Sequence, residues 1–282
     1  MKKDEWTSII KPRRSLFSFN FREVLEKKDL LLLFVKRDFI AIYKQTILGP
    51  LWFFIEPLLT TLIFTIVFGA IAGIETSGIP HMVYYLAGLT LWNYYAECLK
   101  KTSNTFLENQ HIFGKVYFPR LVTPLSIVIS SLIKYAIQFV LFLAVYFYYE
   151  IFTENDFHPQ IHLLLLPVLI FILGVLSLSF GMIISSLTTK YRDLKFLVQF
   201  GVQLWMYASP IIYPLDSVGG NLKTLLMINP VTGIIEAFKF AFFGVGEFSW
   251  IMIAYSSLFT LILFLIATIV FNKTEQNFMD TI

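Results

Sequence analysis

Residues 163–187 read LLLLPVLIFILGVLSLSFGMIISSL, a stretch without a single charged side chain. A helix needs about 20 consecutive apolar residues to cross the hydrocarbon core of a bilayer, so this stretch is long enough to span it. The rest of the chain has a similar character: mean hydropathy is +0.71, 57% of the 282 residues are hydrophobic and 15% are charged. Soluble domains usually contain about 25% charged residues. The composition therefore predicts an integral membrane protein.

Six stretches of this kind punctuate the sequence. We predict spans at residues 50–73, 82–99, 121–149, 163–187, 196–213 and 250–271. Every backbone amide and carbonyl in lipid needs an internal partner, and no stretch has the strict alternation of a barrel strand, so all six should be helices. We expect an all-α fold with one transmembrane domain, residues 50–273, after a cytosolic or interfacial segment, residues 1–49, and before a cytosolic tail, residues 274–282.

The positive charges predict how the chain is oriented. Nineteen of the 22 Lys and Arg residues fall before the first span, between the second and third, between the fourth and fifth, or after the last. Only Lys223 and Lys239 fall in segments on the other side, and Lys134 lies within a span. Cytoplasmic loops carry the excess of Lys and Arg, so both termini of this multi-pass protein should lie in the cytoplasm. No cleavable signal is visible, because the first residues are basic and mixed in character.

Two segments outside the spans have patterns of their own. Residues 17–27 alternate apolar and charged side chains at helical spacing, which predicts an amphipathic helix in the headgroup region; a cytosolic helix packed on a partner fits the pattern as well. The apolar residues Leu30 to Val35 are too few to cross and end at Lys36. Residues 214–249 are too long for a plain connection. Their apolar part, residues 231–246, predicts an external re-entrant hairpin in which Glu236 and Lys239 are spaced to pair.

Charged side chains within spans need a partner or a function. Glu56 precedes Pro57, which removes a backbone hydrogen bond and favours a kink. Lys134 lies near the middle of the third span, where an ionisable group is a functional-site hypothesis by default. A pair with Glu56 or Glu97 is the simpler interpretation. The lone Cys98 excludes an intrachain disulfide and a cysteine cluster for metal.

Aromatic residues make up 17% of the chain and gather on the second and fifth spans. Trp and Tyr near span ends usually belong to the interfacial belt. The alternative is a channel wall, since aromatic rings stack on the C–H faces of sugars and their polar groups bond hydroxyls. The channel-lining candidates are Trp52, Glu56, Tyr84, Tyr85, Trp92, Tyr95, Trp205, Tyr207 and Tyr213.

The usual signatures of an ATPase or a metalloenzyme are missing from the sequence. It contains no GxxxxGK[ST] motif for ATP phosphates, no HExxH motif, and no soluble stretch large enough for a catalytic domain. We expect a chain that is not an enzyme and binds no cofactor. If transport depends on ATP, another chain must hydrolyse it.

A series of short motifs resembles a known family. Residues Arg37-Asp38, then Tyr43-Lys44-Gln45-Thr46-Ile47-Leu48-Gly49, Trp52 and Pro57, resemble the opening of the membrane subunit of polysaccharide ABC exporters. Residues 108–120, Tyr191-Arg192-Asp193-Leu194, Ser209-Pro210, Asn229-Pro230 and 278–282 extend the resemblance. Within the family the chain looks most like the O-antigen and lipopolysaccharide transport permeases, whose relatives export capsule and teichoic acid.

The resemblance implies an assembly and a substrate. It implies a homodimer of six-span subunits with two cytosolic ATP-binding subunits, which bind the ATP and Mg. The substrate would be an undecaprenyl-diphosphate-linked glycan that passes through a channel at the dimer interface, capped externally by the hairpin. Membrane lipids are the other partners, and no nucleic acid is expected. Nothing in the sequence identifies the glycan.

The resemblance also assigns roles to two cytosolic segments. One should dock into the ATP-binding subunit and comprises Glu108, Asn109, Ile112, Phe113, Lys115, Val116, Tyr117, Phe118, Pro119 and Arg120. The other should form the entrance that meets the lipid diphosphate and comprises Arg37, Tyr43, Lys44, Leu48 and Gly49. For each basic residue, the positive-inside rule is an equally good interpretation. A small-solute or drug ABC exporter and a membrane enzyme acting on polyprenyl lipids are the alternatives.

Overall fold

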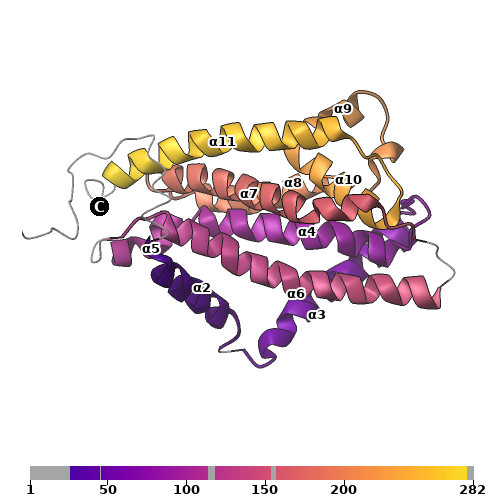
Figure 1. Ribbon diagram of the computed structural model, residues 1–282, viewed down its shortest axis with the longest axis horizontal. Helices are drawn as coiled ribbons and strands as arrows, with labels where there is room; N and C mark the ends of the chain where they lie inside the picture. The colour runs from indigo at the N-terminus through magenta and orange to yellow at the C-terminus, as the bar shows by residue number, and fades with distance from the viewer. Residues whose placement is uncertain (1–25, 45, 114–117, 154–156, 278–282) are drawn as a thin grey trace, which may run out of the picture.

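The computed structural model describes residues 26–44, 46–113, 118–153 and 157–277. Helices form all the regular structure of these residues, and the longest ones run side by side along the molecule (Figure 1). The elements in chain order are α2 (Lys28–Tyr43), η1 (Gly49–Leu51), α3 (Trp52–Phe64), the π-helical η2 (Thr65–Ile71), α4 (His81–Thr102), α5 (Thr105–Phe113), α6 (Val122–Phe152), η3 (Ile161–Leu165), α7 (Leu166–Thr188), α8 (Leu194–Tyr207), η4 (Leu215–Ser217), α9 (Gly220–Ile228), α10 (Pro230–Phe243) and α11 (Trp250–Asn277).

Four helical segments are long and apolar enough to cross a membrane. They are Gly49–Ile71, Val122–Phe152, Ile161–Thr188 and Trp250–Gln276. Helices α9 and α10 make a fifth if they count as one broken span, although they are bent by 97° at their junction. These segments confirm a helical protein with several membrane spans.

The predicted second and fifth spans differ from the other four. Helix α4 has 22 residues but is rich in tyrosine and carries Glu97, Lys100 and Lys101. The helix continues through both lysines to Thr102, beyond the predicted end of the span at residue 99. Helix α8 has 14 residues, which at 1.5 Å per residue extends about 21 Å, less than the ~30 Å of a hydrocarbon core.

Helix α4 lies at the centre of the bundle and provides most of the main core. Sixteen of its residues are buried, and α3, α6, α7, α8 and α10 pack around it. The contact with α7 is especially close, because a Cβ on Gly181 would come 2.4 Å from the Cβ of Thr102. Glycine therefore permits the approach of these two helices.

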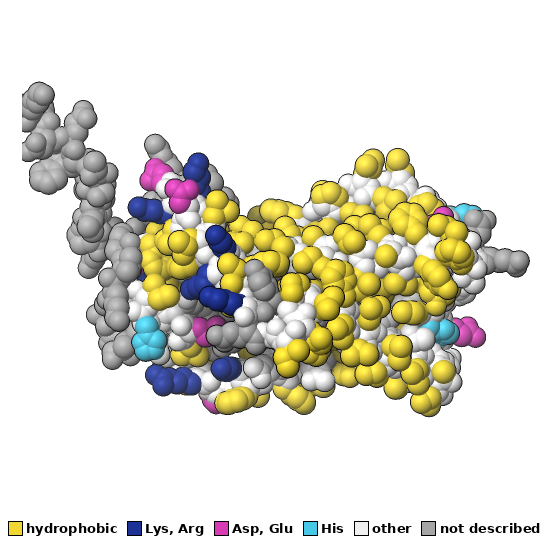
Figure 2. Space-filling model, turned by 90° about the horizontal axis from the view of Figure 1, so that it is seen from below, with side chains coloured by type: hydrophobic (Ala, Val, Ile, Leu, Met, Phe, Trp, Pro, Cys, Tyr) yellow, Lys and Arg dark blue, Asp and Glu magenta, His cyan; other side chains and the backbone are white. Residues whose placement is uncertain are grey.

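Basic side chains gather at one end of the molecule, which we call the basic end. It carries α2, α5, the start of α8 and the C-terminal part of α11. Figure 2 shows Lys and Arg side chains there and a mostly hydrophobic surface over the rest of the same face. The opposite end, called the far end, carries η4, α9 and residues 244–249. This separation matches the one on which the predicted orientation depends.

The N-terminal part differs from its prediction in one respect. The predicted amphipathic segment, residues 17–27, lies almost wholly outside the described residues. The short apolar stretch Leu30 to Val35 lies in α2, which continues past Lys36 without a break to Tyr43. Phe34 and Val35 are buried against the bundle, whereas Leu32 and Leu33 are exposed. At the other terminus, α11 extends to Asn277, past the predicted domain edge at residue 273.

Candidate functional site

A second aromatic core fixes the predicted coupling segment at the basic end. The ring of Phe106 lies 4.7 Å from that of Phe271 on α11, and Phe118 lies 5.6 Å from Phe113 and 5.7 Å from Phe34 on α2. The backbone amide of Phe106 donates to Oγ of Ser185, 3.2 Å away on α7. Helix α5 is therefore joined to α2, α7 and α11.

Two residues of the predicted docking segment are buried in the single chain. Phe113 and Phe118 are 6% and 5% exposed, so their rings hold the coupling segment in place and are not free to enter a groove of another protein. Pro119 and Asn109 are also buried, and the Asn109 amide donates to the Thr105 carbonyl at 2.9 Å.

The accessible part of the segment is polar. Glu108 and His111 are exposed, while Ile112 and Arg120 are half-buried. Arg120 donates to the Glu275 carbonyl on α11 at 2.7 Å. Lys115, Val116 and Tyr117 lie outside the described residues. On α5, Glu108 and His111 are thus exposed, and Leu107, Gln110 and Ile112 are half-buried.

The predicted entrance residues lie along α2 and the segment that follows it. Arg37 makes an ion pair with Asp38 at 2.7 Å, and its guanidinium carbon lies 4.6 Å from the centre of the Phe34 ring. Lys44 and Leu48 are exposed. Gly49 adopts a φ of +52°, a backbone conformation that glycine accepts without strain. Tyr43 ends the helix, but its side chain lies outside the described residues.

The charged residues within the spans form one chain of ion pairs. Lys134 Nζ lies 2.9 Å from Oε2 of Glu97 and 3.8 Å from Oε2 of Glu56. Glu97 also pairs with Lys101 at 2.7 Å. The prediction that Lys134 pairs with Glu56 or Glu97 is confirmed with both partners.

The aromatic residues of α4 do not lie where a channel wall requires them. Tyr84, Tyr85, Trp92 and Tyr95 are all under 5% exposed and belong to the core of the single chain. The Tyr95 ring packs edge-on against Trp205 at 5.5 Å. These four candidates are therefore buried in the single chain, among the helices that pack on α4.

Helix α8 is packed quite differently. Of its fourteen residues, all described, Val202 is the one that is buried. Tyr207 is exposed, Trp205 and Tyr213 are half-buried, and Trp52 and Glu56 on α3 are exposed. These five channel-lining candidates remain accessible in the single chain. One face of α8 combines aromatic rings with amides: Phe196, Gln199, Phe200, Gln203 and Tyr207.

The two Pro-containing motifs of the far end are joined by one side chain. Asn229 caps α10 by accepting from the Val231 amide at 3.0 Å, and its own amide donates to the Ala208 carbonyl at 3.1 Å and to Oγ of Ser209 at 2.9 Å. Asn229-Pro230 is thus fastened to Ser209-Pro210 at the end of α8. Both motifs were visible in the sequence, but nothing in it indicated that their side chains are in contact.

Glu236 and Lys239 are both buried on α10, and their side chains make different contacts. Lys239 donates to the Pro210 carbonyl, and its ammonium lies 3.7 Å from the centre of the Tyr84 ring. Oε1 of Glu236 has no hydrogen-bond partner among the described residues. The contacts of Lys239 thus fix α10 to the end of α8 and to α4, and Glu236 and Lys239 also interact through their charges.

A charge cluster that the sequence did not reveal ties the far-end segments together. Lys223 on α9 pairs with Glu247 and lies 3.8 Å from Asp216 in η4. The hydrogen bond from Lys223 lowers the pKa of Glu247, whereas desolvation and the neighbouring Glu247 raise the pKa of Asp216. Glu247 lies 24 positions after Lys223 in the sequence, so no local pattern could have predicted that it joins the cluster.

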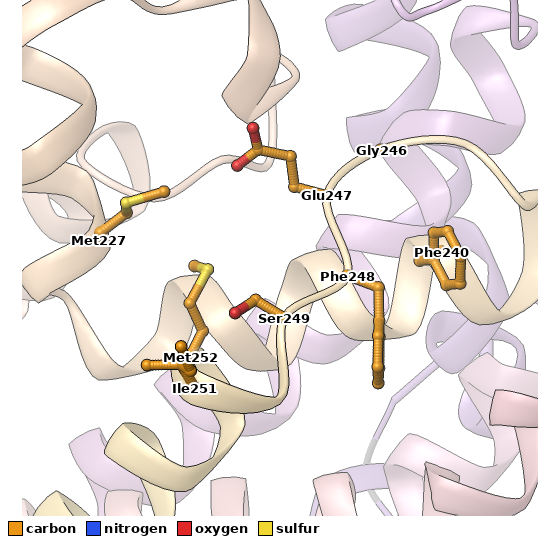
Figure 3. A pocket seen from close by; sticks show the side chains of 8 residues that line it. All are labelled: Met227, Phe240, Gly246, Glu247, Phe248, Ser249, Ile251 and Met252. Carbon is orange, nitrogen blue, oxygen red and sulfur yellow. The ribbon is translucent and has the colours of Figure 1, made fainter.

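An open pocket of about 620 Å³ lies beside this cluster, between α9, the 246–249 loop and the start of α11 (Figure 3). Its lining is mostly apolar and comprises Met227, Phe240, Gly246, Glu247, Phe248, Ser249, Ile251 and Met252. Among the described residues, no group of three or more His, Cys, Asp or Glu could hold a metal ion.

Comparisons with known proteins agree with this arrangement. The profile of the ABC-2 type transporter family matches residues 29–243. The chain is 28% identical over 254 residues to an O-antigen export system permease protein, RfbA, from Klebsiella pneumoniae, which covers 89% of this chain and 94% of the relative. It is 26% identical over 225 residues to RfbA of Myxococcus xanthus, covering 79% and 83%.

A more distant relative is named for a different polymer. The polysialic acid transport protein KpsM of Escherichia coli is 24% identical over 234 residues, covering 81% of this chain and 87% of the relative. The family profile extends from α2 through α10, which includes the coupling segment, α8 and the Asn229 contact but not residues 244–249. On that match, the chain belongs to the ABC-2 type transporter family, as a membrane permease component of ABC transporters.

Proposed function

We propose that this chain is the membrane subunit of an ABC exporter that moves lipid-linked polysaccharide, in the first instance O-antigen, across a bacterial inner membrane. The names of its relatives support the substrate class, and the absence of a phosphate-binding motif from the sequence supports a separate ATP-binding partner. Capsular polysaccharide is the second candidate, favoured by the similarity to KpsM.

The exposed face of α8 is the observation that carries this proposal. Phe196, Phe200 and Tyr207 alternate along it with Gln199 and Gln203, at spacings of three and four residues that put them on one face. An amide side chain facing lipid forgoes its hydrogen bonds, whereas in a water-filled path it can bond sugar hydroxyls. Aromatic rings stack on sugar C–H faces without fixing a register, as a sliding polymer requires.

The neighbouring arc of α8 has the opposite character and provides a matched control. Leu197 and Leu204 are 60% and 51% exposed and suit contact with lipid chains. Because one exposed arc is apolar and the other is mixed aromatic and amide, we infer that α8 lies between lipid and the translocation path. Two copies of the chain, related as a homodimer, would enclose the path between their α8 and α3 helices, with Trp52 and Glu56 on its wall.

The remaining parts of the proposal follow from this arrangement. The basic end would face the cytoplasm by the positive-inside rule, with both termini there and six crossings in total. Helix α5 would receive the ATP-binding subunit through Glu108, His111 and Ile112, while Lys44 and its neighbours would meet the lipid diphosphate. Helices α9 and α10 would form the external re-entrant hairpin.

The test is ATP-driven export by the chain and its ATP-binding partner in proteoliposomes, with a lipid-linked O-antigen as substrate. Q199L/Q203L should lower export about tenfold, because two neutral hydrogen bonds of roughly 0.5–1.5 kcal/mol each are lost. The control L197A/L204A should export normally. Equal export by both double variants, with normal assembly, would contradict the proposed path.

A further inference from the structure

Helix α3 is held to the bundle by a narrow contact. Among its thirteen residues, all described, Phe53, Pro57 and Thr61 are buried, and their spacing of four places them in a single stripe. Leu59, Leu62 and Ile63 on its other sides are about half exposed. Pro57 has no amide hydrogen, so the helix also lacks one internal hydrogen bond at this point.

The two ends of this segment are attached differently. At the far end, a Cβ on Gly69 would come 2.8 Å from the His81 ring, so η2 is pressed against the start of α4. At the basic end, the chain enters α3 through Gly49, which has a φ of +52° and nothing within 4 Å of where a Cβ would lie. The far end is therefore pressed against α4, whereas the chain enters the basic end through a glycine that has no close neighbour at its Cβ position.

Two contacts join the basic end of α3 to the rest of the bundle: Phe53 stacks on Phe39 of α2 at 5.7 Å between ring centres, and Glu56 pairs with Lys134. Glu56 lies 3.8 Å from Lys134, and its side chain is 64% exposed, whereas Glu97 lies 2.9 Å from the same ammonium and is 16% exposed. Removing the sole partner of a buried charge is costly. Here Glu97 remains beside Lys134 when Glu56 leaves, so the contact of Glu56 can open at the small cost of an exposed pair.

We propose that α3 is a hinged wall of the translocation path, that the Glu56–Lys134 contact is its latch, and that Glu97 is the reserve partner that lets the latch open. Movement of α3 about η2 would widen the space beside α8 during transport. This proposal adds a moving part to the path proposed above and rests on it for its role in export, but the movement itself can be measured without any substrate.

The experiment measures how often the buried face of α3 becomes accessible. Thr61 is 0% exposed, so T61C in a C98A background reports opening through its rate of labelling by a membrane-permeant maleimide. Labelling is done in native membranes that contain the full chain and its ATP-binding partner. Cys98, also 0% exposed and on α4, reports general loosening of the core in the otherwise unchanged chain.

The two carboxylates should change the rate in opposite directions. E56Q removes the latch and should speed labelling of T61C about two- to fivefold, the range that corresponds to an exposed ion pair of up to ~1 kcal/mol. E97Q leaves Glu56 as the only partner of Lys134, strengthens the latch and should slow labelling. E247Q, at the unrelated far-end pair, should leave the rate unchanged.

A static role for these charges gives a different pattern. The proposal is overturned if E56Q leaves labelling of T61C unchanged, or if E56Q and E97Q both speed labelling of T61C together with that of Cys98. E56Q alone decides the matter if E97Q does not fold, because Glu56 is largely exposed and its loss leaves Lys134 paired. If the labelling rates change as predicted but the complex exports no glycan, the proposed function is contradicted and the proposed movement of α3 still stands.

Discussion

Helices α4 and α8 carry the same kinds of residue and occupy opposite environments. Both combine aromatic and apolar side chains, but α4 buries sixteen of its 22 residues and α8 buries one of its 14. The rings of α4 fill the centre of a single chain, whereas most of those of α8 lie on its surface. In an apolar helix, residue type alone therefore does not indicate the role of an aromatic residue; the neighbouring helices decide it.

Truncating one aromatic side chain on each helix should give the largest difference in the free energy of unfolding between α4 and α8. Y95A should lower the free energy of unfolding by about 3–5 kcal/mol, because it empties a large buried site. Y207A should change it by less than about 0.5 kcal/mol, as surface substitutions do. Thermal unfolding of the purified chain in detergent measures both, and similar losses for the two variants would contradict the distinction.

A pair of glycines tests the same contrast at the backbone. G181A should destabilise the protein by about 1–3 kcal/mol, because the added methyl overlaps Thr102 where α7 meets α4. G201A on α8 meets nothing within 4 Å and should stabilise the helix by about 0.5–1 kcal/mol. Both shifts are read from unfolding midpoints. A stabilising G181A would show that the α4–α7 contact is looser than described.

The sequence predicted the membrane class, the helical fold, the family and the partners of Lys134, but not the orientation of most side chains. Lys134 was predictable because charges are rare in a span and few partners exist. The burial of Tyr85 and Phe113 was not, since a helix that is apolar all round has no polar face to mark its inner side. The clamp at Asn229 depends on contacts between residues about 20 positions apart, which no local pattern records.

The far end, into which α8 leads, allows a smaller test based on charge. The pKa of Glu247 is lowered, so its contribution to stability is complete above its unfolded pKa and disappears as the pH falls through the lowered value. The pKa of Asp216 is raised, so the folded protein favours its protonated form. At neutral pH, E247Q should lower the unfolding midpoint and D216N should leave it unchanged or raise it. The reverse order would contradict the assignment of Lys223 to Glu247.

Removing the buried tyrosine hydroxyls of α4 should have the smallest effect on the free energy of unfolding. The hydroxyls of Tyr85 and Tyr95 on α4 have no hydrogen-bond partner among the described residues, so Y85F and Y95F should leave the free energy of unfolding within about 0.5 kcal/mol. The control Y255F removes a 2.7 Å hydrogen bond to the Ile228 carbonyl and should cost about 1 kcal/mol. A large loss in Y95F would reveal a partner, such as buried water, inside the α4 core.

The most direct test of the proposed path is contact with the polymer itself. A photo-crosslinking amino acid is placed at Gln203 on α8 or at Tyr95 on α4, and the complex is illuminated during ATP-driven export of a labelled lipid-linked glycan. The account predicts crosslinks to the glycan from position 203 and none from position 95. Crosslinks from position 95 without any from position 203 would place the path through the core of α4 and contradict it.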